Sequence, residues 1–321
     1  MHTRRLRIGT RASALALAQA RRTSETLQAL GMRVEIETIT TRGDADQQDP
    51  VATIGGDGVF VREIERALLE GRIDVAVHSL KDLPTAATPG LVVAGVPERA
   101  SPFDALVGRT APTLAELPTG AVVGTSSVRR VVQVRHLRPD LVVRPIRGNV
   151  DTRLRRLDAG DYDALVLAGA GLERLGLGGR ITEVLRPHTF WPAVSQGALG
   201  LQVRADDQEA RSAVATLDHA ASHAAVHAER ACLAALSGGC LAPVGAWGRV
   251  AGDRLALEAC VFEEADGAVR RISAEGSTPV FDGSEVSIHK AAEQLGARVA
   301  ADLRSRGADG MLERMRASVG P

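Results

Sequence analysis

The feature that most constrains the fold is a pattern that occurs twice in the first two thirds of the chain. The spacing L-x-x-G-x-x-D-x-x-V spans residues 68–77 and again residues 157–166. In both copies we expect a helix that ends at the glycine, because glycine suits the left-handed turn after a helix. A short buried strand follows each glycine, at 73–77 and at 164–168. The repeat predicts two copies of one α/β arrangement.

The segments upstream of each copy extend the repeat. An apolar strand ending in Gly-Thr lies at 6–10 and at 122–125, and a helix begins just after each. The first half continues with a strand at 34–39 and a helix at 59–70, and the second with a strand at 141–144 and a helix at 150–159. Helices that alternate with apolar strands predict two α/β domains rich in parallel strands.

The composition of the chain changes after about His219. An Ala-rich helix is followed by alternating strands such as 255–262 and by a helix from about 284 to 304, which predicts a small α+β domain. With 321 residues the chain is long enough for more than one core. We expect domain 1 at 1–97 and 198–217, domain 2 at 102–192, and domain 3 at 219–321.

Charge and hydropathy exclude several classes of protein. Lys plus Arg and Asp plus Glu both number 39, so no overall field attracts nucleic acid or an anionic membrane. No apolar stretch approaches the roughly 18 residues of a membrane span. Three cysteines are too few for a disulfide scaffold and suit a reducing cytoplasm. We therefore expect a cytoplasmic protein that binds neither nucleic acid nor membrane.

Arginine is concentrated between residues 125 and 156, a segment that contains nine arginines and only two aspartates. Such a run is commonly a solvated helix face. Its position favours an anion site instead, because Thr125 and Ser127 follow a buried strand and open a helix, where free backbone amides attract anions. Arg129 and Arg130 lie in the first helical turn, where a cation is disfavoured unless an anion offsets it. Guanidinium groups bind carboxylates in a bidentate manner.

Nucleic acid is the obvious alternative ligand for an arginine-rich surface. Single-stranded nucleic acid requires aromatic side chains on which bases stack, but the chain has one Tyr, two Trp and five Phe, none of them interleaved with these arginines. A small molecule that carries carboxylates or phosphates fits better.

A second polar segment follows the first copy of the strand. Lys81 and Asp82 form either a surface ion pair or a functional pair, in which the lysine binds an anion and the carboxylate stabilises a developing cation or transfers a proton. His78 and Ser79 precede them, but we expect no catalytic triad, because neighbours in sequence rarely converge in the required geometry.

The cysteines and histidines differ in their surroundings. Cys232 lies on an apolar helix and Cys260 in an alternating strand, so both are expected to be packed and inert. Cys240 follows two glycines just after a helix, and both a structural and a reactive cysteine remain open. The histidines at 219, 223 and 227 share one helix face, but no cysteine or carboxylate joins them at metal-ligand spacing, so no metal site is expected.

Seven segments together carry a resemblance to a known family. They are TRAS at 10–13, GGDGVF at 55–60, HSLKD at 78–82, GTSSVRR at 124–130, RGNV at 147–150, QGA at 196–198 and GGC at 238–240. In this order and spacing they resemble the porphobilinogen deaminase family over essentially the whole chain.

The resemblance implies two α/β domains like those of type II periplasmic binding proteins, followed by a small C-terminal α+β domain. It also implies a monomeric transferase of tetrapyrrole (porphyrin and haem) biosynthesis. Such an enzyme joins four porphobilinogen units, with release of ammonia, into hydroxymethylbilane. A dipyrromethane cofactor would be attached through a thioether to Cys240. The remaining alternative is a non-catalytic polycarboxylate-binding protein on the same scaffold, which would not need Cys240.

The resemblance also assigns site residues by position. Asp82 is the implied catalytic residue. The implied cofactor-binding residues are Cys240, Lys81, Thr125, Ser127, Arg129, Arg130, Arg147, Asn149 and Arg153. The implied substrate-binding residues are Arg11, Ser13, Gln19, Phe60, Arg174 and Gln196. Two positions depart from the family pattern: Asp57 stands where many members have Lys, and Ser195 stands where Gly is common.

Overall fold

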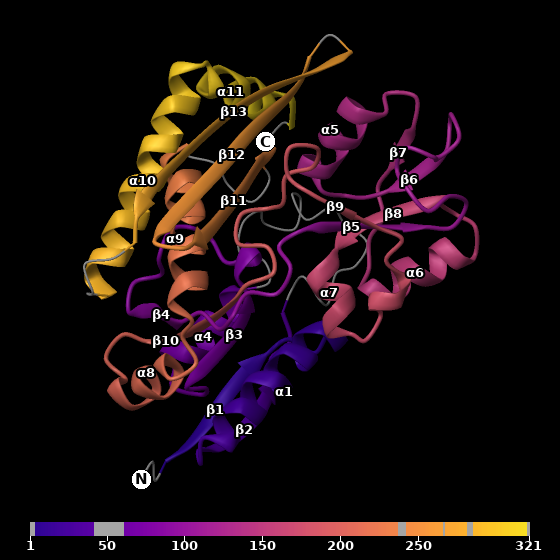
Figure 1. Ribbon diagram of the computed structural model, residues 1–321. Helices are drawn as coiled ribbons and strands as arrows, with labels where there is room; N and C mark the ends of the chain where they lie inside the picture. Colours follow the sequence, from indigo (N-terminus) through magenta and orange to yellow (C-terminus); the bar gives the residue numbers. More distant parts are fainter. Residues whose placement is uncertain (1–3, 42–60, 237–241, 266, 281–284, 320–321) are drawn as a thin grey trace. The chain divides into compact units, whose positions relative to one another are not determined.

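The computed structural model describes residues 4–41, 61–236, 242–265, 267–280 and 285–319 (Figure 1). The chain divides into two compact units. Unit 1 consists of residues 1–100 and 197–223, and unit 2 of residues 101–196 and 224–321. In the part of the chain that is described, no helix is long and apolar enough to cross a membrane.

Unit 1 is built on a five-stranded sheet with the order β2-β1-β3-β10-β4. Strand β1 pairs in parallel with β2 and β3, whereas β10 runs antiparallel to both β3 and β4. The elements are β1 (Arg5–Thr10), α1 (Ala14–Ala29), β2 (Arg33–Thr38), α4 (Arg62–Leu69), β3 (Val75–Ser79), η1 (Leu80–Asp82), β4 (Leu91–Gly95), β10 (Leu199–Arg204) and α8 (Gln208–Ala215).

The first sheet of unit 2 has the equivalent order, β7-β6-β8-β5-β9. Strand β6 pairs in parallel with β7 and β8, and β5 runs antiparallel to β8 and β9. The elements are β5 (Asp104–Gly108), β6 (Val122–Gly124), α5 (Val128–Leu137), β7 (Val142–Arg144), α6 (Val150–Asp158), β8 (Ala164–Ala168), α7 (Gly169–Arg174), η2 (Gly178–Arg180) and β9 (Glu183–Leu185).

The repeated aspartate has the same structural role in both sheets. The Asp74 carboxylate accepts a hydrogen bond of 3.0 Å from the backbone N–H of Arg7 on β1, and the Asp163 carboxylate accepts one of 2.8 Å from the N–H of Val122 on β6. In each half the aspartate therefore fixes the start of the third strand to the first strand. The repeated glycines, Gly71 and Gly160, both have a positive φ, as a left-handed turn after a helix requires.

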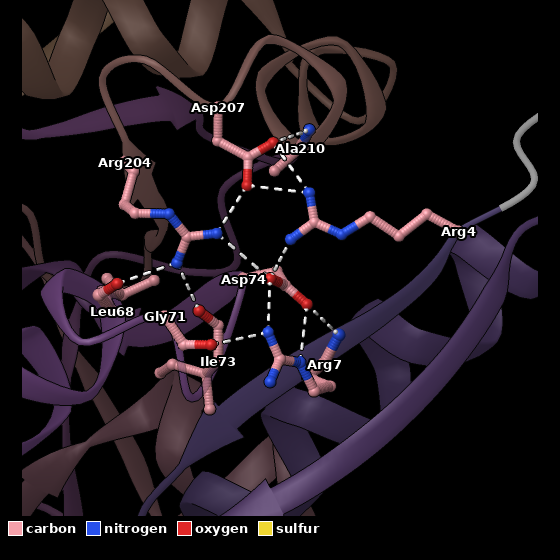
Figure 2. A network of polar contacts seen from close by, with 9 residues as sticks. All are labelled: Arg4, Arg7, Leu68, Gly71, Ile73, Asp74, Arg204, Asp207 and Ala210. Atoms are coloured by element: carbon pink, nitrogen blue, oxygen red, sulfur yellow. Dashed lines mark hydrogen bonds and ion pairs between the residues drawn. The ribbon is translucent and has the colours of Figure 1, made fainter.

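Asp74 is completely buried at the centre of an arginine network (Figure 2). Arg4, Arg7 and Arg204 all form ion pairs with its carboxylate. Burial acts to raise the pKa of Asp74, but the hydrogen bonds from Arg7 and Arg204 and the charge of Arg4 outweigh burial and lower this pKa to about 2. The network joins β1, the start of β3 and the end of β10.

The C-terminal part of unit 2 is a three-stranded antiparallel sheet, β11-β12-β13. Helices α9, α10 and α11 share one hydrophobic core with this sheet, and Figure 1 shows α9 and α10 beside it. A smaller cluster that includes Trp191, Cys260 and Phe262 joins the sheet to Val132 of α5. The elements are α9 (Ala220–Ala235), β11 (Val244–Ala251), β12 (Arg254–Ala265), β13 (Ala268–Pro279), α10 (Glu285–Ser305) and α11 (Ala308–Val319).

The segment that leads out of unit 2 is held by a buried carboxylate on α9. Glu229 accepts hydrogen bonds from the backbone N–H of Ser195, at 2.6 Å, and from that of Gly248 on β11, at 2.7 Å. Ser195 is fully buried and has a φ of 60°, in the left-handed region. Within the described residues its hydroxyl has no hydrogen-bond partner.

The predicted fold class is confirmed: two similar α/β sheets are followed by a C-terminal α+β part. Most predicted elements are found within one or two residues, and the strand predicted at 164–168 is found at those residues. The strand predicted at 73–77 is found at Val75–Ser79. It begins later because the N–H groups of Arg72 and Ile73 still donate to the carbonyl of Ala67 and close the turn after α4.

Candidate functional site

The first turn of α5 carries two buried arginines that share one carboxylate. Arg129 and Arg130 are only 4% and 7% exposed. Arg129 donates from Nη1 to Asp104 Oδ2 at 2.8 Å and to the carbonyl of Trp191. Arg130 donates from Nε and Nη2 to Asp104 Oδ1, at 2.9 and 2.7 Å. Asp104, the first residue of β5, thus fixes both guanidinium groups.

The electrostatics of this cluster follow from burial and charge. Burial acts to raise the pKa of Asp104, but the charges of Arg129 and Arg130 and their hydrogen bonds outweigh it and hold this pKa far below its ordinary value. Burial lowers the pKa of Arg129, and the charge of Arg130 acts in the same direction. Asp104 is therefore ionised at neutral pH.

Gln196 completes the network around Asp104. Its Nε2 donates to the carbonyl of Pro102 at 2.8 Å and to Asp104 Oδ1 at 3.0 Å, and its Oε1 accepts from Arg130 Nη2 at 3.4 Å. The side chain is 1% exposed. Two of the implied cofactor-binding residues and one implied substrate-binding residue thus meet at Asp104, a residue that the sequence patterns did not single out.

The turn before α6 adds further positive charge. Within the described residues Arg147 has a buried Nη1 without a hydrogen-bond partner, and Arg153 donates from Nε to the carbonyl of Gly148 at 2.8 Å. Burial, together with repulsion from Arg130 and Arg147, lowers the pKa of Arg153 to about 10. Neither Arg147 nor Arg153 has an ion pair with any described carboxylate. A buried cation is costly without a counter-charge, so this surplus fits a bound polyanion.

Hydroxyl and amide side chains lie next to these arginines in the sequence, at the starts of helices α5 and α6. Thr125, which is buried, accepts a hydrogen bond of 3.3 Å from the Ser127 N–H. Ser127 and Asn149 are the N-cap residues of α5 and α6, and neither side chain makes a capping hydrogen bond. Arg174, the last residue of α7, is half-buried. The side chains of Ser127 and Asn149 remain available to a ligand.

In unit 1 the residues after β3 form a short 3₁₀ turn, η1, that carries Lys81 and Asp82. The Leu80 N–H donates to the carbonyl of Ala198 at 3.0 Å and anchors the turn to the segment before β10. Lys81 and Asp82 are both half-buried. No described residue forms an ion pair or hydrogen bond with the Asp82 carboxylate, so it can serve a ligand.

Hydrogen bonds between polar side chains hold the end of β3 on both sides. Gln19 of α1 donates from Nε2 to Ser79 Oγ at 3.0 Å. On the other side His78 Nε2 lies 3.0 Å from Gln202 Oε1, and Gln202 Nε2 donates to Glu65 Oε1 at 2.8 Å. Burial lowers the pKa of His78 to about 4, so its imidazole is neutral at physiological pH.

The remaining implied substrate residues are placed as follows. Ser13 is the N-cap residue of α1, where its hydroxyl accepts a hydrogen bond of 3.4 Å from the Ala16 N–H, and Gln19 is buried against Ser79. Both therefore have contacts within the protein itself. Arg11, in the turn before α1, is half-buried. Phe60 and Cys240 lie outside the described residues, as does Asp57.

The other two cysteines are enclosed. Burial raises the pKa of the Cys232 and Cys260 thiols to about 12, and for Cys232 the charge of Glu229 acts in the same direction. No group of three or more His, Cys, Asp or Glu side chains able to hold a metal ion occurs among the described residues.

The repeated sheets define an α/β protein, and the arginine surplus at α5 and α6 fits a polyanionic ligand. Comparison with known proteins narrows this class. Residues 6–212 match the family model described as "Porphobilinogen deaminase, dipyromethane cofactor binding domain", and residues 223–305 match "Porphobilinogen deaminase, C-terminal domain". The chain belongs to the porphobilinogen deaminase family.

Curated relatives carry the same name. A porphobilinogen deaminase of Roseiflexus sp. (strain RS-1) is 53% identical over 256 residues, which cover 79% of this chain and 84% of the relative. That of Acidothermus cellulolyticus is 48% identical over 312 residues, which cover 96% of this chain and 91% of the relative.

Among solved structures, the chain is similar to the methionine binding protein MetQ, with 15% identity, a TM-score of 0.44, and coverage of 66% of this chain and 89% of that chain. It is also similar to a periplasmic substrate-binding protein of an ABC transporter from Coxiella burnetii, with 17% identity, a TM-score of 0.43, and coverage of 66% and 91%.

Proposed function

We propose that the chain joins four porphobilinogen units head to tail, with release of ammonia, to give hydroxymethylbilane. Family membership makes the chain a transferase of tetrapyrrole biosynthesis. The observation in the structure that best supports the proposal is the uncompensated charge of Arg147 and Arg153. Each porphobilinogen ring brings an acetate and a propionate, so a growing oligomer supplies the anions that these guanidinium groups lack.

The family's dipyrromethane cofactor fits the residues of unit 2. Arg129, Arg130, Arg147 and Arg153 present four positive charges against the single carboxylate of Asp104. We propose that they bind the carboxylates of dipyrromethane, together with Lys81, Thr125, Ser127 and Asn149, and that Cys240 carries the thioether. When bound, the cofactor supplies the pyrrole carbon to which the first new ring is joined. A covalent anchor makes each addition effectively intramolecular on one side.

We propose that Asp82 is the catalytic residue. Loss of ammonia from porphobilinogen leaves an electron-poor methylene pyrrole, and a nearby carboxylate stabilises such a cation. The Asp82 carboxylate is suited to this role because it has no ion pair with a described residue, while the turn that carries it is anchored at Leu80 and Ser79.

The substrate contacts are proposed by family position. They are Arg11, Ser13, Gln19, Phe60, Arg174 and Gln196. The contacts of Ser13, Gln19 and Gln196 within the protein imply that these three act by holding backbone or neighbouring side chains as much as by touching substrate.

We also propose the organisation and setting of the enzyme. The three separate sheets support a division into domain 1 (1–97 and 198–217), domain 2 (102–192) and domain 3 (219–321). The balanced charge and the few cysteines support a cytoplasmic protein with no nucleic-acid or membrane partner, and a monomer is proposed from the family resemblance alone.

Substitution of Asp82 tests the mechanism. We expect Asp82→Asn to keep the thermal unfolding transition and the covalent adduct while turnover of porphobilinogen falls by roughly 100-fold or more, because an amide cannot neutralise the cation. Asp206→Asn, which removes an exposed carboxylate of the same unit, is the matched control and should retain full turnover. Near-normal turnover of Asp82→Asn would remove this residue from the mechanism.

Intact mass of the purified protein tests the wider proposal. An adduct of two linked pyrrole units on Cys240 is expected for the enzyme. A chain that stays unmodified after incubation with porphobilinogen, and releases no ammonia, would favour a polycarboxylate-binding protein instead.

A further inference from the structure

Asp104 is the one described carboxylate that forms ion pairs with the buried arginines of α5. It accepts four hydrogen bonds: from Arg129 Nη1, from Nε and Nη2 of Arg130, and from Gln196 Nε2. Three of these bonds end on Oδ1 and one on Oδ2, so both carboxylate oxygens are engaged within the protein. Asp104 is also fully buried, and it therefore acts on a ligand only through the residues that it holds.

The network includes both segments by which the chain passes between the units. Pro102 lies just after the passage at 100/101, and Gln196 lies just before the passage at 196/197. Gln196 Nε2 donates to the Pro102 carbonyl as well as to Asp104, and Gln196 Oε1 accepts from Arg130. The position of the Arg130 guanidinium is thus set jointly by β5 and by the segment around residue 196.

Arg130 also belongs to the group of uncompensated charges. Together with Arg147 it lowers the pKa of Arg153, so both of these positive charges lie close enough to Arg153 to repel it. Mutual repulsion tends to drive such side chains apart. Arg130 donates two hydrogen bonds to the same oxygen of Asp104, Oδ1, and this contact opposes the tendency and keeps one of the charges in a defined place.

We propose that Asp104, acting with Gln196, is a positioning residue that orients Arg129 and Arg130 for the carboxylates of dipyrromethane. The inference rests on the proposed function. Two effects oppose each other when Asp104 loses its charge: the site becomes more positive, which favours an anion, and the arginines lose their orientation. The loss of orientation has the larger effect. Buried guanidinium groups without a counter-charge turn toward water, and a displaced guanidinium no longer matches the geometry of a ligand carboxylate.

Asp104→Asn tests this inference, with Asp74→Asn as the matched control. Both substitutions replace a fully buried carboxylate that is surrounded by arginines, but Asp74 contacts none of the implied cofactor-binding residues (Figure 2). The full chain is produced without its adduct and incubated with porphobilinogen, and the fraction that carries the adduct is followed by intact mass. The melting temperature of each variant is measured in parallel.

We expect loading of Asp104→Asn to be slower by roughly 10- to 100-fold. Asp74→Asn should load at the parent rate although its melting temperature falls at least as far. Parent-like loading of Asp104→Asn overturns the inference. So does slow loading of both variants in proportion to their loss of melting temperature, because the effect would then be one of general stability.

A second variant keeps the test valid if Asp104→Asn does not fold. Gln196→Ala leaves every charge in place and removes only the amide that joins Asp104, Arg130 and the Pro102 carbonyl. Loading should slow by a few-fold to about tenfold, and unchanged loading refutes the inference. If the parent chain itself never acquires an adduct, the proposed function fails; if the parent loads and the variants load equally well, only the role of Asp104 fails.

Discussion

Ser195→Gly should make the protein more stable, although a buried side chain is being removed. Ser195 has a φ of 60°, and a residue with a Cβ in the left-handed region costs roughly 1–2 kcal/mol. Its hydroxyl is buried without a partner among the described residues, which costs about 1–3 kcal/mol. Glycine opposes these gains by about 0.5–1 kcal/mol, because it makes the unfolded chain more flexible. After loss of some packing, the free energy of unfolding should rise by about 2 kcal/mol.

Differential scanning calorimetry of samples with equal adduct content measures the effect. For a unit of this size about 2 kcal/mol corresponds to a rise in melting temperature of roughly 4–8 °C. Ser195→Ala separates the two contributions, because it removes the hydroxyl but keeps the strained Cβ, and it should give only about half of the gain. A fall in melting temperature for Ser195→Gly, or a larger gain for Ser195→Ala than for Ser195→Gly, would refute the reasoning.

Two further predictions concern buried titratable groups. The pKa of His78 is about 4 in the folded protein, against 6.5 for an unperturbed histidine, so between pH 7 and 5 the unfolded chain gains a proton that the folded one does not. Stability should therefore fall by about 2 kcal/mol over this range and by less in His78→Asn, as measured by urea unfolding; an equal fall in both proteins would contradict the assignment. Because the pKa values of Cys232 and Cys260 are raised to about 12, iodoacetamide at pH 8 should leave both unmodified in the folded protein and label both in urea, and peptide mass spectrometry that finds them labelled without denaturant would show that they are accessible.

The repeated pattern carried most of the fold prediction. Glycine followed three residues later by aspartate marks a helix end and a strand start in both halves, and the structure gives both aspartates the same backbone contact. What the pattern did not reveal is the difference between the copies. Asp74 gathers three arginines, whereas Asp163 forms its ion pair with Arg109. Arg204 reaches Asp74 from more than a hundred positions away, and spacing along the chain contains no information about such a contact.

The candidate site was predicted less completely. The position of Arg129 and Arg130 in a first helical turn correctly indicated a need for negative charge, but a ligand alone was expected to supply that charge. Asp104 lies 25 and 26 residues before its arginine partners and 92 before Gln196. It begins a strand and belongs to no motif, so only the folded sheet brings it to them. Ser13 shows the converse case, since a serine before a helix serves as an N-cap without any ligand.

The place of β10 in the first sheet has a consequence for biosynthesis. It lies between β3 and β4, although residues 101–196 separate it from both in the sequence. A ribosome adds about 5–20 residues per second, so β10, the strand that joins β3 to β4, is synthesised roughly 5–20 s after them. The sheet formed by β5 to β9 has all its strands before β10 emerges. Of the two repeated sheets, the one whose translation begins first is thus completed second, and the unpaired edges of β3 and β4 are exposed to wrong partners in the meantime.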